Sequence, residues 1–225
     1  MIFTEDDETI DQILSSVESI CKKYPEKYWL ELDKAQSYPT EFVKSMTESG
    51  HLNALIPTKY GGAGLSLLIA ARILEKIHQS GCNAAAAHAQ MYTMGSILKY
   101  GSEAQKSKWL PLIAKGEVRL QAFGVSEPEA GTDTSSISTR AIRKENKYIL
   151  NGQKIWTSRA LHSDLMILLA KTKSKNERNS KSDGLSLFLI DIRESLGSGM
   201  TIRPIETMIN HSTTEVFFDN LEISH

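Results

Sequence analysis

The spacing of apolar residues changes near the middle of this 225-residue chain, and that change constrains the fold more than any other feature. From Ile10 to Tyr24, apolar side chains recur at the i, i+3, i+4 and i+7 spacing of one helical face. After about residue 117 they come in short runs of strand length. We therefore predict an α+β fold, with an all-α helical N-terminal domain over residues 1–116 and a small antiparallel β-barrel or sandwich domain over residues 117–225.

Capping signals give the expected bounds of the helices. Thr4 is a suitable N-cap for the first helix, and Ser102 with Gln105 has the spacing of a capping box. Further helices are expected over residues 39–49, 66–80 and 83–100, each followed by a glycine. The capping box should start a short fifth helix that ends near Pro111.

Four consecutive alanines, 84–87, and Ala89 give one predicted helix a surface of small side chains. Such a surface lets another helix or a ligand approach closely, and we favour helix packing because small residues are common in cores. We interpret His51 and His88 as interior histidines rather than catalytic ones.

The second half reads as a series of short strands. They are expected over residues 120–125, 138–143, 148–150, 153–156, 165–170, 185–191 and 214–223. Asn151-Gly152 is typical of a tight turn and would separate the third strand from the fourth. The polar segment 173–183 is predicted to be a solvated loop at a hairpin tip.

Composition excludes some classes of protein. The formal net charge is -1, so no basic face for nucleic acid is expected. Cys21 and Cys82 are the only cysteines and lack CxxC spacing. A disulfide stays open, but we expect buried thiols in a reducing compartment. No apolar run approaches the roughly 20 residues of a membrane helix, so we expect a soluble intracellular protein without a membrane span.

The stretch AFGVSEPEAGTDT, residues 122–134, carries more hydrogen-bonding groups than a plain turn needs. Pro128 should stop the strand, and Gly131 would permit a positive φ or close approach. Backbone N–H groups and the hydroxyls of Ser126, Thr132 and Thr134 suit a polar ligand such as a phosphate-bearing cofactor. The alternative is an ordinary capped turn. The stretch is neither a GxGxxG nor a P-loop motif.

A second cluster, KIWTSR, spans residues 154–159. Trp156 fits a core position, as a lone tryptophan usually does. However, two hydroxyls and Arg159 follow it at a strand end, and an aromatic plane beside donors is a good edge for a flat heterocycle.

These residues carry a family resemblance. The segments FGVSEPEAGTDT, YILNGQKIWTS and TEVFFDNLEIS, in this order and separation, strongly resemble the acyl-CoA dehydrogenase family of flavoproteins, and PTKYGGAGLS resembles its early loop. Glu129 and Thr132 stand where glycine and serine are also common in that family. The resemblance covers nearly the whole chain.

The resemblance implies FAD as cofactor. The strand from Phe123 to Ser126 would face the flavin, with the backbone of Val125 and the backbone and hydroxyl of Ser126 on the pyrimidine side of the ring. Trp156 would lie against the isoalloxazine.

The remaining predicted contacts also come from the resemblance. Thr157 and Ser158 would reach the N5–O4 edge of the flavin, where a donor favours the reduced ring. Thr132 would lie near the cofactor or the acyl-CoA chain, and no metal is expected.

The resemblance implies a reaction as well, the α,β-dehydrogenation of an acyl-CoA thioester with hydride transfer to flavin N5. In the family the base is a glutamate on a C-terminal helical bundle. This sequence stops at His225, so we expect a truncated chain, or one whose partner supplies the bundle. We assign no catalytic base: Glu127 and Glu129 lie in the cofactor turn, and Asp133 should cap it.

The implied partners are the acyl-CoA substrate, an electron-transfer acceptor and further copies in a homo-oligomer of the full-length form. The expected location is the cytoplasm, or the mitochondrial matrix in a eukaryote. Two alternatives stay open: an acyl-CoA oxidase or flavin monooxygenase on the same scaffold, or a non-catalytic flavin-binding or assembly module.

Overall fold

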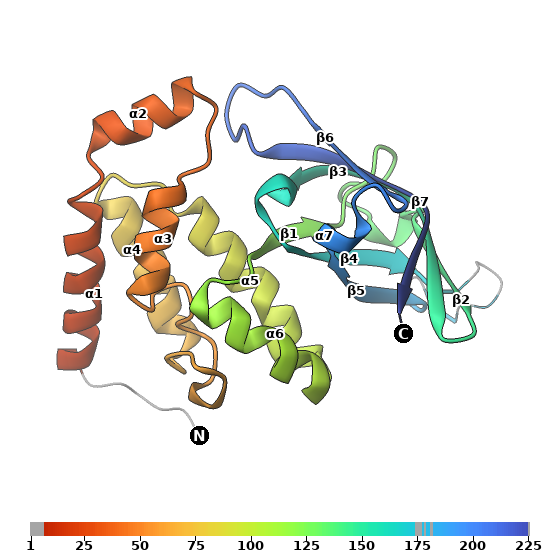
Figure 1. The fold of residues 1–225 in the computed structure, drawn as a ribbon, viewed down its shortest axis with the longest axis horizontal. Coiled ribbons are helices and arrows are strands. Elements are labelled where there is room, and N and C mark those ends of the chain that lie inside the picture. The colour runs from red at the N-terminus through yellow and green to blue at the C-terminus, as the bar shows by residue number, and fades with distance from the viewer. Residues whose placement is uncertain (1–6, 174–176, 178, 181, 225) are drawn as a thin grey trace. The chain divides into compact units, whose positions relative to one another are not determined.

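The computed structural model of the chain describes residues 7–173, 177, 179, 180 and 182–224 (Figure 1). It divides into two compact units, Met1–Arg119 and Leu120–His225. Among the described helices, none combines the length and apolarity that crossing a bilayer requires.

Helices make up the first unit. They are α1 Asp7–Cys21, α2 Glu26–Lys34, α3 Thr40–Glu48, α4 Leu67–Gln79, α5 Ala85–Tyr100 and α6 Glu103–Lys115, with the 3-10 turn η1 Thr58–Tyr60 before α4. The Ser66 hydroxyl caps α4 by accepting a hydrogen bond from the Ile69 N–H. Both bonds of the predicted capping box are present between Ser102 and Gln105 at the start of α6.

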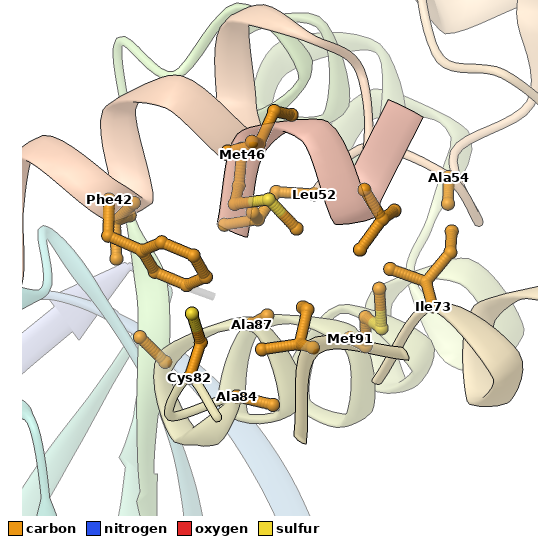
Figure 2. Packing of buried hydrophobic residues seen from close by; sticks show 14 of the residues in the cluster. Phe42, Met46, Leu52, Ala54, Ile73, Cys82, Ala84, Ala87 and Met91 are labelled. Carbon is orange, nitrogen blue, oxygen red and sulfur yellow. The ribbon is translucent and has the colours of Figure 1, made fainter. Parts of the chain in front are cut away.

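The core of this unit is built from the apolar stripes of the helices. Figure 2 shows Phe42, Met46 and Leu52 packed opposite Cys82 and Ala87. The two cysteines are buried and free, and the Cys82 thiol lies 3.7 Å from the carbonyl oxygen of Cys21. Burial raises the pKa of the Cys21 thiol to about 12, so it stays protonated and serves as a core residue.

Two helical predictions differ from the structure. The last helix continues past Pro111 to Lys115. Proline removes only one backbone donor there, and burial of Leu110 and Ile113 on either side stabilises the helical path. No helix was predicted where α2 lies, because α2 has no fully buried residue and therefore no clear apolar stripe. The expected start at Thr4 lies outside the described residues.

His51 and His88 were both predicted to be interior residues, and the structure confirms this for His51 only. His51 is buried, its Nε2 lies 3.1 Å from Ser16 Oγ, and burial lowers its pKa. His88 is exposed, with its ring centroid 5.1 Å from that of Tyr92, so the interior interpretation is wrong for it. The neighbouring alanines 84, 86, 87 and 89 are buried in helix packing, as expected.

Strands make up the second unit (Figure 1). They are β1 Leu120–Gly124, β2 Arg140–Lys144, β3 Lys147–Ser158, β4 Leu165–Lys171, β5 Leu185–Asp191, β6 Met200–Pro204 and β7 Thr213–Ser224, with the short helix α7 Ile192–Ser195 after β5. The described strands form one seven-stranded sheet in the order β1-β4-β2-β3-β7-β6, and β5 pairs with β4. This confirms the α+β class. The sheet is mixed, because β1 pairs with β4 in parallel.

The prediction of a tight turn at Asn151-Gly152 is wrong. Both residues lie inside the twelve-residue strand β3, where the register with β7 shifts between Leu150 and Gly152. Glycine is required for close approach instead: its φ is +149°, and an added Cβ would meet Thr139 at 2.5 Å. The predicted β4–β5 hairpin is present, although part of its tip lies outside the described residues.

Candidate functional site

The two motifs singled out in the sequence meet at neighbouring strand ends of the second unit. The chain leaving β1 runs beside β3, and the Ile155 N–H donates a hydrogen bond to the carbonyl oxygen of Ser126 at 2.9 Å. Ile155 directly precedes Trp156, so this bond brings the backbone of the first motif next to the second. The adjacency on which the flavin hypothesis depends is therefore present.

Trp156 sits at an irregularity in β3. The register with β7 shifts between Lys154 and Thr157, and Trp156 has a φ of +61°, in the left-handed region. Such a conformation is unusual for a bulky residue and costs free energy unless the surroundings enforce it. The bulge turns the indole outward, where 58% of the residue is exposed. A strained, exposed tryptophan at a strand end is a candidate ligand platform.

The next two residues point in different directions. Thr157 is buried, and its Oγ1 has no hydrogen-bond partner among the described residues. Ser158 is half-buried, and its Oγ accepts a hydrogen bond from Asn210 Nδ2 at 3.0 Å. The Ser158 hydroxyl therefore keeps its own proton available for a further acceptor. Only Ser158 presents its side chain toward the partly exposed side of the strand.

A buried ion pair lies beneath these strand ends. Lys154 Nζ is 2.8 Å from Glu127 Oε1, and the side chains are 0% and 3% exposed. Lys154 Nζ also donates to the carbonyl oxygen of Val125 at 2.9 Å. The Glu127 carboxylate further accepts from the N–H and hydroxyl of Ser138 and, at 2.9 Å, from the N–H of Thr139. Both charges are thus paired inside the fold.

These contacts decide the charge state of Glu127. Burial would raise its pKa, but the hydrogen bonds from Lys154, Ser138 and Thr139 outweigh burial and lower the pKa to about 2. Burial also lowers the pKa of Lys154, and the contact with Glu127 opposes that shift. A saturated carboxylate with so low a pKa is a poor proton acceptor.

The loop after Glu127 holds the other predicted residues. Asp133 caps the 3-10 turn η2 Thr134–Ser136, and its carboxylate accepts a hydrogen bond from the N–H of Ser135 at 3.0 Å. Its expected capping role is confirmed. Glu129 and Thr132 are exposed. Gly131 has neither a positive φ nor an atom within 4 Å of an added Cβ, so the reason given for a glycine there is wrong.

The structure brings together part of the predicted set. Val125 and Ser126 are half-buried at the end of β1, beside Trp156 and Ser158 at the end of β3. Phe123 is half-buried within β1, two residues before Val125. Thr132 is exposed in the loop that follows Glu127.

Sequence reasoning missed the residues that support the site. Lys154 lies in the motif at residues 154–159 and received no predicted role, although a lysine at an inward strand position is a usable signal. Asn210, which holds Ser158, adopts a φ of +58°, and asparagine is one of the few residues that tolerates it. Nothing in the spacing links it to a segment 52 residues away.

Two family models match the sequence: the acyl-CoA dehydrogenase N-terminal domain over residues 7–117 and the acyl-CoA dehydrogenase middle domain over residues 122–221. The chain belongs to the acyl-CoA dehydrogenase family. The chain is 34% identical over 198 residues to the glutaryl-CoA dehydrogenase of Desulfococcus multivorans, covering 85% of the chain and 49% of that protein. It spans about half the length of the curated relatives it matches.

Solved structures share the fold of this chain. The acyl-CoA dehydrogenase of Geobacillus kaustophilus has a TM-score of 0.86 at 26% identity, covering 99% of this chain and 58% of that chain. The prolyl acyl carrier protein oxidase AnaB has a TM-score of 0.83 at 26% identity, covering 98% of this chain and 58% of that one. One scaffold is therefore shared by a dehydrogenase and an oxidase.

Proposed function

We propose that the strand ends of the second unit bind FAD and that the chain takes part in the α,β-dehydrogenation of an acyl-CoA thioester. The observation that carries this is the adjacency of Ser126 to the outward-turned Trp156, through the hydrogen bond between Ile155 N–H and the Ser126 carbonyl. The indole supplies an apolar plane and the neighbouring groups supply polar contacts, which is the pattern of a site for a flat, polar heterocycle.

The residues present fit such a group. Trp156 adopts a strained backbone conformation and leaves its ring largely exposed. Burial of the ring inside this unit therefore does not compensate for the strain. A ring stacked on the indole would cover that surface. Ser158 stands next to it with a donor to spare, because Asn210 occupies only an acceptor position of its hydroxyl.

Each residue then has a limited task. When bound, FAD would supply the acceptor for the hydride that leaves the β-carbon of the acyl group. The backbone of Val125 and Ser126 orients the pyrimidine side, Trp156 excludes water from one edge, and Ser158 donates toward the N5–O4 edge. Thr157 contributes through its main chain, since its side chain faces the interior.

We assign no catalytic base within the cofactor turn. Glu127 is held ionised by Lys154 and saturated with hydrogen bonds, and Asp133 caps η2. Glu129 is exposed, in a position to be solvated rather than desolvated for proton abstraction. The family expectation that the base belongs to a separate helical segment therefore stands as part of the proposal.

The test is a fluorescence titration of the purified chain with FAD, followed by anaerobic addition of acyl-CoA thioesters of different lengths. We expect saturable quenching, weakened roughly tenfold by Ser158→Ala. The matched control is Ser198→Ala, an exposed serine of the same unit. Titration curves that are flat for the wild type would overturn the flavin assignment. Because the base is proposed to belong to a separate helical segment, this chain alone should bind FAD without bleaching by the thioesters. Binding that still shows no bleaching when a base-bearing helical segment is added would favour a non-catalytic module.

A second candidate, an oxidase on the same scaffold, is favoured by the likeness to the prolyl acyl carrier protein oxidase. The two activities differ in what reoxidises the flavin. Oxygen consumption during turnover, compared with turnover on an artificial electron acceptor under nitrogen, separates them. Turnover that needs oxygen supports the oxidase, and turnover that needs only the acceptor supports the dehydrogenase.

A further inference from the structure

The buried pair Lys154–Glu127 joins three of the segments that the proposed site uses. Lys154 belongs to β3, two residues before Trp156, and its ammonium reaches back to the carbonyl of Val125. Glu127 lies directly after Ser126. Its carboxylate accepts hydrogen bonds from the backbone N–H groups of residues 138 and 139, at the end of the loop that follows Glu127. Two side chains thus tie the end of β1, the exit of the loop and the bulge of β3 together.

A buried ion pair contributes little net stability to a fold, because burying two charges costs free energy of desolvation. Two charges with side-chain exposures of 0% and 3% lose their hydration, and their attraction only partly offsets that loss. Apolar residues of similar size often stabilise an interior at least as well. Lys147, on the same strand as Lys154, pairs with Glu222 of β7 at 2.6 Å. Both side chains of this surface pair are 58% exposed, so it carries no such desolvation cost. The buried pair therefore calls for a reason other than net stability.

We propose that Lys154 and Glu127 are positioning residues for the flavin site, fixing the carbonyl of Val125 and the backbone of Ser126 against the Trp156 bulge. This rests on the proposed function. Neither side chain touches the ligand. Lys154 sets the distance between the two strand ends, and Glu127 orients Lys154 while holding the loop exit.

A charge-neutral double variant separates positioning from stability. Lys154→Met alone leaves the Glu127 carboxylate buried without its counter-charge and should be strongly destabilised. Combining Lys154→Met with Glu127→Gln removes both charges, so most of the stability should return. The hydrogen bond to the Val125 carbonyl does not return, because methionine has no donor. The matched control is Lys147→Met, which removes a lysine of the same strand from the exposed pair.

Two measurements on the full chain give the outcome. Titration with FAD should show affinity weakened roughly tenfold or more in the double variant, even where its thermal midpoint matches the wild type, and unchanged affinity in Lys147→Met. Amide hydrogen exchange without flavin should be faster around Ser126 and Ile155 in the double variant only.

The outcomes distinguish this inference from the proposed function. Wild-type FAD affinity in a stable double variant overturns the positioning role and leaves the flavin site standing. A wild type that binds no FAD overturns the flavin proposal. In that case unchanged amide exchange in the double variant overturns the positioning of the strand ends as well, whereas faster exchange supports it.

Discussion

Gly152 and Thr139 lie so close that a side chain on the glycine would have no room: an added Cβ would stand 2.5 Å from Thr139 Oγ1 and 2.7 Å from its Cα. Gly152 also has a φ of +149°, which L-residues rarely adopt. We expect Gly152→Ala to destabilise the chain by about 3 kcal/mol, because it adds both a backbone clash and conformational strain. Chemical denaturation of the two proteins measures the difference.

Gly131→Ala is the matched control for this prediction. Nothing lies within 4 Å of a Cβ added at Gly131, and its φ is not in the left-handed region. The substitution should therefore change the free energy of unfolding by less than about 0.5 kcal/mol. Equal losses in the two variants would show that the approach of Gly152 to Thr139 is not what requires glycine.

Acid sensitivity should follow from Glu127. Its pKa is lowered from 4.5 to about 2 in the folded chain, so its ionised form stabilises the fold above pH 4.5, and that contribution disappears as the pH falls toward 2. The shift corresponds to about 3 kcal/mol. The free energy of unfolding of the wild type minus that of Glu127→Gln should therefore shrink between pH 4.5 and pH 2, as urea titrations at each pH would show.

The exposed Glu222, paired with Lys147, provides the comparison. Glu222→Gln should follow the wild-type acid profile closely, because solvent screens an exposed pair. A wild-type advantage over Glu127→Gln that stays constant down to pH 2 would mean that folding does not lower the pKa of Glu127.

Local signals predicted the elements that depend on local chemistry. The capping box at Ser102 was readable, because it satisfies backbone donors a few residues away. The helix beginning near residue 66 was readable from its apolar spacing and the glycine that follows it. The helix through Pro111 was not readable, because burial of its neighbours decides it. Asn151-Gly152 has the composition of a turn, yet the contact with Thr139 places it inside a strand.

The candidate site shows the same division. The two motifs were predicted to meet, and the bond between Ile155 and Ser126 shows that they do. The direction of each side chain was not predictable, because the bulge at Trp156 breaks the alternation of β3 and turns Thr157 inward. The Lys154–Glu127 pair spans 27 residues, and no spacing rule links its members.

Because Trp156 has a positive φ, a glycine variant at this position should be more stable than an alanine variant, which is the reverse of the usual order in a strand. At a regular strand position alanine is preferred over glycine, but in the left-handed region glycine avoids the penalty that any Cβ carries. We expect Trp156→Gly to be more stable than Trp156→Ala by about 1 kcal/mol. Both variants should lose FAD affinity, because both lack the indole.

Ile155 is the control for that order. It precedes Trp156 in the same strand and is not among the residues with positive φ. Ile155→Ala should therefore be more stable than Ile155→Gly. The same order at both positions, measured by thermal denaturation, would contradict the strained backbone at Trp156.

The unpaired hydroxyl of Thr157 permits a test of which side chain meets the ligand. Thr157 Oγ1 is buried without a hydrogen-bond partner among the described residues, so Thr157→Val removes an unsatisfied polar atom and should leave stability unchanged or raise it by about 1 kcal/mol. Thr214 Oγ1 donates to the carbonyl oxygen of Thr157 at 2.7 Å, and Thr214→Val should therefore lower stability by about 1 kcal/mol. Thr157→Val should bind FAD as the wild type does, unlike Ser158→Ala. A loss of affinity as large as that of Ser158→Ala would instead mean that the Thr157 side chain rotates to the ligand when the site is filled.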